Sequence, residues 1–226
     1  MGKLQDAPAR EPFLIGLTGL YCAGKNHVGA LLEKRGLPVL DVDKLGRRVL
    51  ESAQEEIVRR FGTGILGPDK RPDRKLLGKR VFRRAEDLAA LEGIVHPAAN
   101  AGTEQWIAGQ EGPCVINAAL LHRSSVFSRL NLILIVRAPF PVRFFRAWKR
   151  DALPPGELLR RFFSQRNFPH KAPGGPQFFS TPADIQIIEN SGLPGSNRNL
   201  ENRINHILEG LDSLWKRKNY CSSQSR

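Results

Sequence analysis

A glycine-rich turn near the start of the chain limits the possible folds more than any other segment. Residues 13–19 form a short apolar run, and an apolar pattern with helical spacing covers residues 25–32. Between them, Gly19 and Gly24-Lys25 stand at the spacing of the pattern G-x-x-x-x-G-K. In this pattern consecutive backbone N–H groups and a helix N-terminus surround phosphates, while the lysine neutralises their charge. We therefore predict a phosphate-binding loop; an ordinary turn before a helix is the alternative.

The residue that follows Lys25 departs from the pattern. The pattern ends in Ser or Thr, whose hydroxyl holds Mg²⁺, whereas this chain has Asn26. An amide oxygen is also a hard ligand, but it reaches one atom further and requires the loop or a water to adjust. If Asn26 is a compromise, Asn26→Thr should improve the use of Mg²⁺. Phosphate binding depends on the backbone, and the expected N–H donors are Cys22, Ala23, Gly24, Lys25, Asn26 and His27.

Four further segments are typical of strands, and helical patterns separate them. They are residues 38–43, 113–120, 131–136 and 184–188. The second and third are almost continuous apolar runs, as in strands covered on both faces. Strands alternating with helices imply a parallel sheet with right-handed crossovers. We therefore predict an α/β fold with a parallel five-stranded sheet flanked by helices, and a ligand site beyond the carboxyl ends of the strands, where Gly19 and Asp43 lie.

The apolar spacing also divides the chain into parts. A long stretch between the second and third strands has helical spacing, which indicates a helical insertion, and His96-Pro97 is expected to end one of its helices. Residues 171–182 are rich in Pro and Gly and predict a loop. The predicted parts are a nucleotide-binding core at 11–60, 113–142 and 183–218, a helical insertion at 61–112, a lid at 143–170 and a flexible tail at 219–226.

The positive charge of the chain lies mainly in two segments. The formal net charge is +13, and residues 69–84 and 143–171 each contain eight basic and two acidic side chains. Basic segments attract phosphates whatever molecule carries them, but tyrosine is scarce, and we find no aromatic–basic interleaving like that of an RNA-stacking sheet. We expect small-molecule phosphates rather than nucleic acid as partners, with a solvated helix face as the alternative for each segment.

Composition favours the cytoplasm as the site of action. No apolar run reaches the roughly 20 residues that cross a bilayer, and the first ten residues lack the apolar stretch of a signal peptide. Cys22, Cys114 and Cys221 are widely spread and lie outside metal-ligand spacing, so we expect reduced thiols. We expect no membrane association, and a monomer.

Read in order, these segments resemble the dephospho-coenzyme A kinase family over nearly the whole chain. GLTG with AGK, followed by LEKRGLPVLDVDKLGRRVLE, resembles the family's phosphate loop and Asp-x-Asp segment. FGTGILGPDKRPDRKLLGKRVF and LEGIVHP resemble the family's helical insertion, and RAWKRD and LLRRFFSQ resemble its lid. AALLHR stands where the family has a Pro-Leu-Leu segment, and ADIQIIENSG resembles its closing strand. The resemblance implies a P-loop kinase fold and transfer of the γ-phosphoryl of ATP, with Mg²⁺, to the ribose 3′-hydroxyl of dephospho-coenzyme A, the last step of coenzyme A synthesis.

The resemblance also implies roles for single residues. Phosphoryl transfer requires alignment of two oxygens and cationic charge around the moving group. The expected catalytic residues are Asp43, Lys25, Arg146 and Arg150. The expected ATP-binding residues are Gly19, Cys22, Ala23, Gly24, Lys25, Asn26, His27, Arg150 and Asn190. The expected substrate-binding residues are Asp43, His96 and Arg160, and the expected metal-binding residues are Asn26 and Asp41. Asn117 and Arg123 stand where the family commonly has acidic residues.

Several alternatives stay open at this point. Asp41 and Asp43 are expected on alternate faces of a strand end, but they could instead cap the next helix. The arginines could be ordinary surface residues. Because Asn26 stands at the metal position, the chain could also bind nucleotide or coenzyme A without catalysis, act on a related small molecule, or be a basic nucleic-acid-binding protein.

Overall fold

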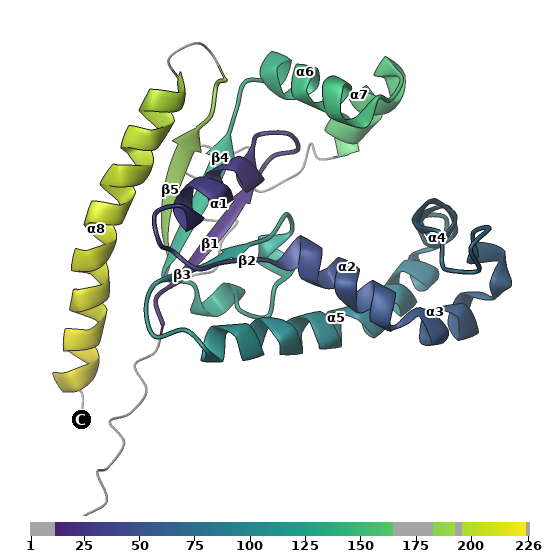
Figure 1. Cartoon of the computed structure of the whole chain (residues 1–226), viewed down its shortest axis with the longest axis horizontal. Coiled ribbons are helices and arrows are strands. Elements are labelled where there is room, and N and C mark those ends of the chain that lie inside the picture. Colours follow the sequence, from purple (N-terminus) through teal and green to yellow (C-terminus); the bar gives the residue numbers. More distant parts are fainter. Residues whose placement is uncertain (1–11, 165–182, 193–195, 225–226) are drawn as a thin grey trace, which may run out of the picture. The chain divides into compact units, whose positions relative to one another are not determined.

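A five-stranded sheet forms the centre of one of the two units of this chain (Figure 1). The computed structural model describes residues 12–164, 183–192 and 196–224. It divides the chain into a core unit, Met1–Leu40 with Gly109–Arg226, and a helical unit, Asp41–Ala108. The strands are β1 (Leu14–Gly19), β2 (Val39–Asp41), β3 (Cys114–Asn117), β4 (Leu132–Arg137) and β5 (Asp184–Glu189), in the order β2-β3-β1-β4-β5. The pairs β1–β3, β1–β4 and β4–β5 are parallel, and the predicted five-stranded parallel sheet is confirmed.

The core unit buries both faces of the central strands. On one face, α1 (Lys25–Glu33) and α8 (Ser196–Gln224) pack against the sheet; Val28 and Ile204 join Ile15 of β1 in a single apolar cluster. On the other face, Leu121 at the start of η2 (Leu121–Arg123) lies against Gly16 of β1, and η3 (Phe127–Arg129) follows. Coverage on both faces explains why β1 and β4 read as continuous apolar runs.

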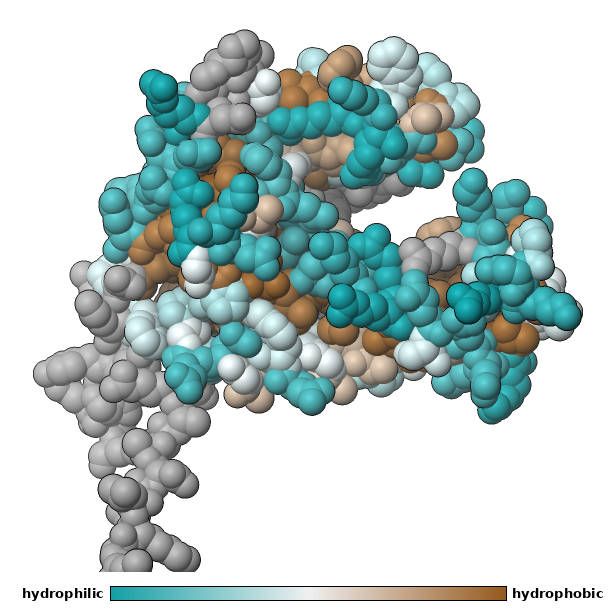
Figure 2. All heavy atoms as spheres, viewed as in Figure 1, coloured by the Kyte–Doolittle hydropathy of each residue, from teal (hydrophilic) through white to brown (hydrophobic). Residues whose placement is uncertain are grey.

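Two helices follow β4 in the segment predicted to be a lid. α6 (Phe140–Asp151) ends at Ala152, whose φ of 49° is left-handed, and α7 (Pro155–Ser164) begins after Pro154. Proline is well suited to the first position of a helix because its missing N–H would be unpaired there. Phe145 and Phe163 are more than half exposed, and Figure 2 shows apolar side chains among hydrophilic ones on this part of the surface.

The helical unit has an apolar cluster of its own. Its helices are α2 (Val42–Ser52), α3 (Gln54–Phe61), η1 (Thr63–Ile65), α4 (Arg74–Val81) and α5 (Ala85–Ala108). Ile57, Phe61, Ile65, Leu77 and Val81 are buried together at the centre of this unit. The Asp73 side chain accepts hydrogen bonds from the backbone N–H groups of Lys75 and Leu76, at 2.7 and 2.9 Å, and so starts α4.

The structure differs from the sequence-based expectations at two helix boundaries. The strand expected at residues 38–43 ends at Asp41, so Asp43 lies in the first turn of α2 and the expected alternation of Asp41 and Asp43 along a strand is wrong. The expected helix end at His96-Pro97 is also wrong, because α5 continues through Pro97. Proline lacks the N–H that would bond to the carbonyl four residues earlier, and packing of α5 against α2, α3 and α4 outweighs this lost hydrogen bond.

The bounds of the helical unit and of the last helix also differ from those expected from the sequence. The helical unit begins at Asp41, whereas the insertion was expected from residue 61. α8 runs to Gln224, so it includes most of the expected tail at 219–226. The loop expected at 171–182 and the end of the lid, 165–170, lie outside the described residues. Within the part of the chain that the structure describes, no helix is long and apolar enough to cross a membrane.

Candidate active site

The turn between β1 and α1 has the backbone of a phosphate loop. Gly24 is the N-cap of α1 with a φ of 96°, and Cys22 has a φ of 57°. Left-handed residues in such a turn direct successive N–H groups to one side, which makes an anion-binding concavity at the helix N-terminus. Gly19 is required for close packing, because a Cβ there would lie 2.6 Å from the Val136 carbonyl oxygen. The residues from Gly19 to Asn26 are called the phosphate loop below.

The Ala23 carbonyl ties the phosphate loop to two other elements. It accepts hydrogen bonds from Arg146 Nη1 of α6 at 3.1 Å and from Asn190 Nδ2, directly after β5, at 2.9 Å. Arg146 Nη2 also donates to Asn190 Oδ1 at 3.2 Å. Asn190 is 4% exposed, and a Cβ on Gly24 would collide with its amide. The three residues therefore close a ring of hydrogen bonds that holds the loop in one conformation.

Asp151 joins the same loop to α6 and α7 through a second group of contacts. Its carboxylate accepts hydrogen bonds from the Tyr21 hydroxyl and from Arg150 Nε, the latter at 2.7 Å, and pairs with Arg161 Nη1 at 3.6 Å. The Arg150 guanidinium also lies over the Tyr21 ring at 5.2 Å, and the Phe162 ring packs edge-on against Tyr21 at 5.1 Å. One carboxylate thus organises two arginines beside the phosphate loop.

The environment of this cluster shifts the pKa values of several of its side chains. The hydrogen bond from Arg150 lowers the pKa of Asp151, because it favours the charged carboxylate. Burial raises the pKa of Tyr21, and its hydrogen bond to Asp151 raises it further. Burial also raises the pKa of the Cys22 thiol, although Arg150 acts in the opposite direction. At neutral pH Asp151 is therefore charged while Tyr21 and Cys22 keep their protons.

The departure at Asn26 is matched by a second amide. Asn117 at the end of β3 donates from Nδ2 to Asn26 Oδ1 at 3.3 Å. Asn117 is 3% exposed, and its Oδ1 has no hydrogen-bond partner among the described residues. Mg²⁺ prefers oxygen ligands and usually keeps several waters, so both amide oxygens fit such an ion, directly or through a water. The amide pair is compatible with a metal at this end of the loop.

The helical unit contains the expected site residues Asp41, Asp43 and His96. Asp41 is the N-cap of α2: its Oδ1 accepts from the Lys44 N–H at 2.9 Å, and its Oδ2 lies 3.7 Å from Lys44 Nζ. The capping role that the sequence left open for this residue is therefore real, because the first N–H groups of a helix need acceptors. Asp43 and His96 are exposed on α2 and α5.

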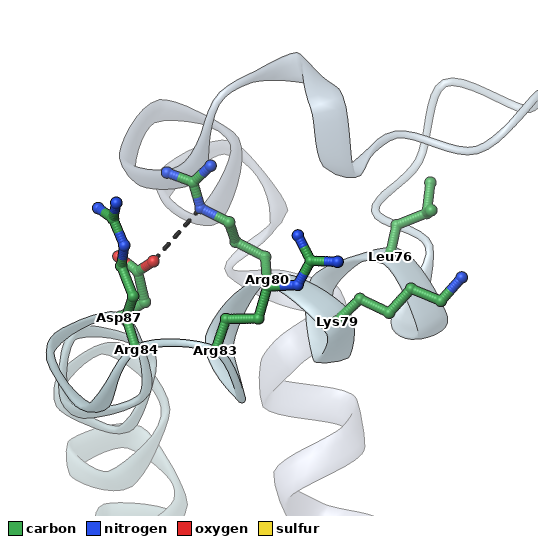
Figure 3. Close-up of a pocket in the computed structure, with 6 residues that line it drawn as sticks. All are labelled: Leu76, Lys79, Arg80, Arg83, Arg84 and Asp87. Carbon is green, nitrogen blue, oxygen red and sulfur yellow. Dashed lines mark ion pairs between the residues drawn. The ribbon is translucent and has the colours of Figure 1, made fainter.

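A basic hollow of about 420 Å³ lies where α4 meets α5. It is lined by Leu76, Lys79, Arg80, Arg83, Arg84 and Asp87, so four cations face one carboxylate, an excess of three positive charges. Figure 3 shows the Arg80 guanidinium directed at Asp87, with an Nε–Oδ2 distance of 3.3 Å, while Lys79 extends away from this pair. Asp87 is 7% exposed, and its ion pair with Arg80 links α4 to α5.

The structure brings most of the expected ATP-binding residues together in the core unit. The phosphate loop, Arg146 and Asn190 are in contact, and Arg150 contacts Tyr21 of the loop. Arg160 is exposed on α7, and no described contact joins it to this group. Sequence reasoning missed Tyr21 and Asp151. The adjacent residues Arg150 and Asp151 could have indicated this contact, because a carboxylate next to an arginine can bind its guanidinium.

A parallel sheet with this loop between its central strand and first helix defines a P-loop kinase fold. A family model described as dephospho-CoA kinase matches residues 13–172. A dephospho-CoA kinase from Halalkalibacterium halodurans is 35% identical over 186 residues, which cover 79% of this chain and 88% of that protein. One from Thermus thermophilus is 33% identical over 204 residues, covering 90% of this chain and 94% of that protein. The chain belongs to the dephospho-CoA kinase family.

Solved structures share the fold of this chain. The crystal structure of a protein from Thermus thermophilus has a TM-score of 0.73 at 32% identity, and the match covers 89% of this chain and 99% of that one. A dephospho-CoA kinase from Campylobacter jejuni has a TM-score of 0.57 at 19% identity and covers 89% of this chain and 98% of its own, which shows a shared fold.

Proposed function

We propose that this protein transfers the γ-phosphoryl group of ATP to the ribose 3′-hydroxyl of dephospho-coenzyme A, giving coenzyme A and ADP in the last step of coenzyme A synthesis. The observation that supports this most is the phosphate loop, with Gly24 left-handed at the start of α1, in a chain of the dephospho-CoA kinase family. A turn of this geometry provides backbone donors for the phosphates, and Lys25 adds the positive charge.

ATP binding rests on the phosphate loop and the residues that hold it. The N–H groups of Cys22 to His27 would surround the phosphates, with Lys25 on the β- and γ-phosphates and Asn190 near the adenine. Arg146 and Asn190 hold the loop in position through hydrogen bonds to the Ala23 carbonyl. Because these hydrogen bonds fix the loop, its backbone donors are positioned for the phosphates.

Transfer also needs charge stabilisation and a base. Arg146 and Arg150 would spread positive charge over the moving phosphoryl group, a task that suits the permanently charged guanidinium. Asp43 would accept or orient the proton of the attacking 3′-hydroxyl. Its exposure on the first turn of α2 leaves it accessible to a substrate. His96 and Arg160, both exposed, would contact the coenzyme.

A divalent cation would complete the charge balance. Asn26 and Asp41 are the expected residues for Mg²⁺, which when bound neutralises the β- and γ-phosphates. Asp41 Oδ1 caps α2, and this bond would have to persist or exchange when a metal binds. The amide oxygens of Asn26 and Asn117 offer neutral ligands instead of a hydroxyl and a carboxylate.

The basic hollow suits the anionic half of the acceptor. Dephospho-coenzyme A carries a diphosphate, and the hollow has an excess of three positive charges. We propose that Lys79, Arg83 and Arg84 attract this diphosphate while Arg80 stays paired with Asp87.

We also propose that the protein works in the cytoplasm as a monomer. Cys22 and Cys114, the cysteines for which the structure describes a state, are unpaired, as is usual in a reducing compartment. Light scattering of the purified protein measures the oligomeric state, and a molecular mass of twice 25.2 kDa would contradict the monomer.

An ADP-release assay tests the activity. Dephospho-coenzyme A, adenosine and shikimate are compared as acceptors, with Mg²⁺ and with Mn²⁺, and we expect ADP release with dephospho-coenzyme A. Asp43→Ala should lower turnover by about 10²- to 10⁴-fold, the usual contribution of a positioned base. Glu55→Ala, which removes another exposed acid from a first helical turn of the same unit, is the matched control.

Other outcomes identify the alternatives. ATP binding without ADP release under either metal would mean a non-catalytic nucleotide-binding protein. Duplex binding that is lost steeply with salt and does not compete with ATP would mean a nucleic-acid-binding protein. Full turnover in Asp43→Ala would remove Asp43 from the mechanism.

A further inference from the structure

Two neutral amides meet where phosphate-loop enzymes usually have a hydroxyl and a carboxylate. In P-loop proteins the Ser or Thr after the lysine and an Asp at a neighbouring strand end hold the metal together. Here the two side chains in contact are Asn26, in the first turn of α1, and Asn117, at the end of β3. Both side chains are neutral amides, so this chain differs from the usual hydroxyl–carboxylate pair at both positions.

The geometry makes the two residues dependent on each other. Asn117 is 3% exposed and lies in a strand that pairs with β1, so its backbone position is fixed. Its Nδ2 reaches Asn26 Oδ1 at 3.3 Å because the Asn side chain is one atom longer than Ser or Thr. A carbonyl oxygen has two lone pairs, so Asn26 Oδ1 can accept this bond and still face a cation or its water.

The other end of the Asn117 amide points to a missing ligand. Asn117 Oδ1 is buried and has no hydrogen-bond partner among the described residues. A buried acceptor without a donor is costly, and native proteins usually satisfy such atoms with protein or water. A water in the hydration shell of a divalent cation is a strong donor, and Mg²⁺ retains several such waters.

We propose that Asn26 and Asn117 form one coupled unit that receives the nucleotide-bound divalent cation. Asn117 Nδ2 orients Asn26 Oδ1, and Asn117 Oδ1 accepts a hydrogen bond from a water of that cation. The inference rests on the proposed function for the presence of a metal-bound nucleotide, whereas the hydrogen bond between the two side chains does not depend on that function.

The coupled unit predicts that restoring the usual metal ligands requires substitutions at both positions. The hydroxyl of Thr at position 26 would sit one atom short of Asn117 and would leave both ends of a buried amide unpaired. Asn26→Thr alone should therefore not improve metal binding, whereas Asn26→Thr with Asn117→Asp restores a hydroxyl and a carboxylate that suit each other.

The first experiment measures the coupling without metal or nucleotide. Thermal unfolding is compared in EDTA for the wild type, Asn26→Ala, Asn26→Thr, Asn117→Asp and the Asn26→Thr/Asn117→Asp variant. Asn26→Ala and Asn26→Thr should each lower Tm by roughly 3 to 8 °C. Asn199→Thr, an exposed position on α8, is the control and should leave Tm unchanged. Additive Tm changes in the double variant would overturn the coupling.

The second experiment measures the metal directly. Free Mn²⁺ is followed by electron paramagnetic resonance in the presence of enzyme and a non-hydrolysable ATP analogue. Asn26→Thr should leave Mn²⁺ affinity unchanged or weaker when residue 117 is Asn, and should raise it about tenfold when residue 117 is Asp. The same effect of Asn26→Thr in both backgrounds would overturn the proposal.

The two measurements separate this inference from the proposed function. If the wild type fails to bind the ATP analogue, the proposed function fails while the unfolding cycle still tests the Asn26–Asn117 unit. If the analogue binds and the Asn26→Thr effect is independent of residue 117, the unit has no role in metal binding and the proposed kinase activity stands. If Asn117→Asp does not fold, the Asn26 variants remain the test. An unchanged Tm in Asn26→Ala, or tighter Mn²⁺ binding in Asn26→Thr, would then overturn the proposal.

Discussion

The two basic segments have the same net charge in the sequence, yet the structure uses them differently. In α6 and α7, arginines are bound to fixed acceptors: Arg146 to the Ala23 carbonyl and Asn190, and Arg150 to Asp151. At the corner of α4 and α5, four cations line an open hollow with one carboxylate. The difference teaches that charge alone does not define a role. Cations with fixed partners can position groups, whereas cations around an open hollow attract anions.

The strongest test of the positioning role is Arg146. Arg146→Ala removes the donors to the Ala23 carbonyl and Asn190, so kcat/KM for ATP should fall by about 100-fold, as on loss of one positioned donor. Arg146→Lys should not restore activity, because an ammonium cannot bridge both acceptors as the guanidinium does. Lys149→Ala, an exposed residue on the same helix, is the control in steady-state assays. A normal rate in Arg146→Ala would mean that the hydrogen-bonded ring is dispensable.

Asp151 should have the next largest effect. Asp151→Asn removes the charge that holds Arg150 and Arg161, and we expect about a tenfold loss in kcat. The folded-state pKa of Asp151 is lowered, so its stabilising contribution is complete above the unfolded pKa of about 4 and is lost as the pH falls through the lower folded value. The difference in free energy of unfolding between wild type and Asp151→Asn should therefore be present at pH 7 and shrink below pH about 4.

A matched variant separates this cluster from ordinary ion pairs. Glu157 pairs with Arg161 at 3.6 Å on the exposed surface of α7. Glu157→Gln should change stability by less than about 0.5 kcal/mol, in urea unfolding at both pH values. An equal loss in Glu157→Gln and Asp151→Asn would mean that net charge, rather than the Tyr21 and Arg150 contacts, explains the effect.

Substitutions in the basic hollow should change the affinity for dephospho-coenzyme A rather than the turnover rate. Arg83→Glu reverses one of its charges and should raise KM for dephospho-coenzyme A about three- to tenfold while KM for ATP stays unchanged. The effect should weaken at high salt, because screening acts on exposed charges. Arg59→Glu makes the same charge change on α3 and is the control in a titration of dephospho-coenzyme A. An equal rise in both variants would assign the effect to total charge.

Cys22 gives the smallest expected effect. Because burial raises its pKa, iodoacetamide should modify it slowly at pH 7 and faster as the pH rises toward 9. ATP should slow the reaction, since Cys22 lies in the phosphate loop. Cys114 is an internal control, because burial raises its pKa to about 11 and its side chain is 0% exposed. Mass spectrometry in a Cys221→Ser background measures both sites; equal modification with and without ATP would argue against nucleotide binding at this loop.

Local sequence patterns predicted the regular secondary structure of this protein well. Strand β4 and helix α1 were predictable because burial on both faces of a strand, or on one side of a helix, imposes a period on apolar residues. The start of α2 was not predicted correctly, because Asp41 serves as a cap and shortens the strand. The course of α5 through Pro97 was also missed, since neighbouring helices outweigh a local breaker.

In the candidate site, the sequence predicted the backbone turn but not the contacts between distant side chains. The spacing of Gly19, Gly24 and Lys25 predicted the loop, since backbone geometry at a strand–helix turn is a local property. The links of this loop to Arg146, Asn190 and Asp151 join residues more than 120 positions apart in the chain, as in the pairs 23–146, 23–190 and 21–151. No periodicity encodes such pairs.

The sequence by itself determined the α/β class, the phosphate loop and the departure at Asn26, because each depends on residues next to one another along the chain. Only the tertiary structure shows that Asn26 contacts Asn117, that Asp151 joins Tyr21 to Arg150, and that Arg146 and Arg150 have fixed acceptors while side chains of the other basic segment line a hollow. These contacts depend on how strands and helices pack, and packing brings together side chains whose positions in the sequence are unrelated.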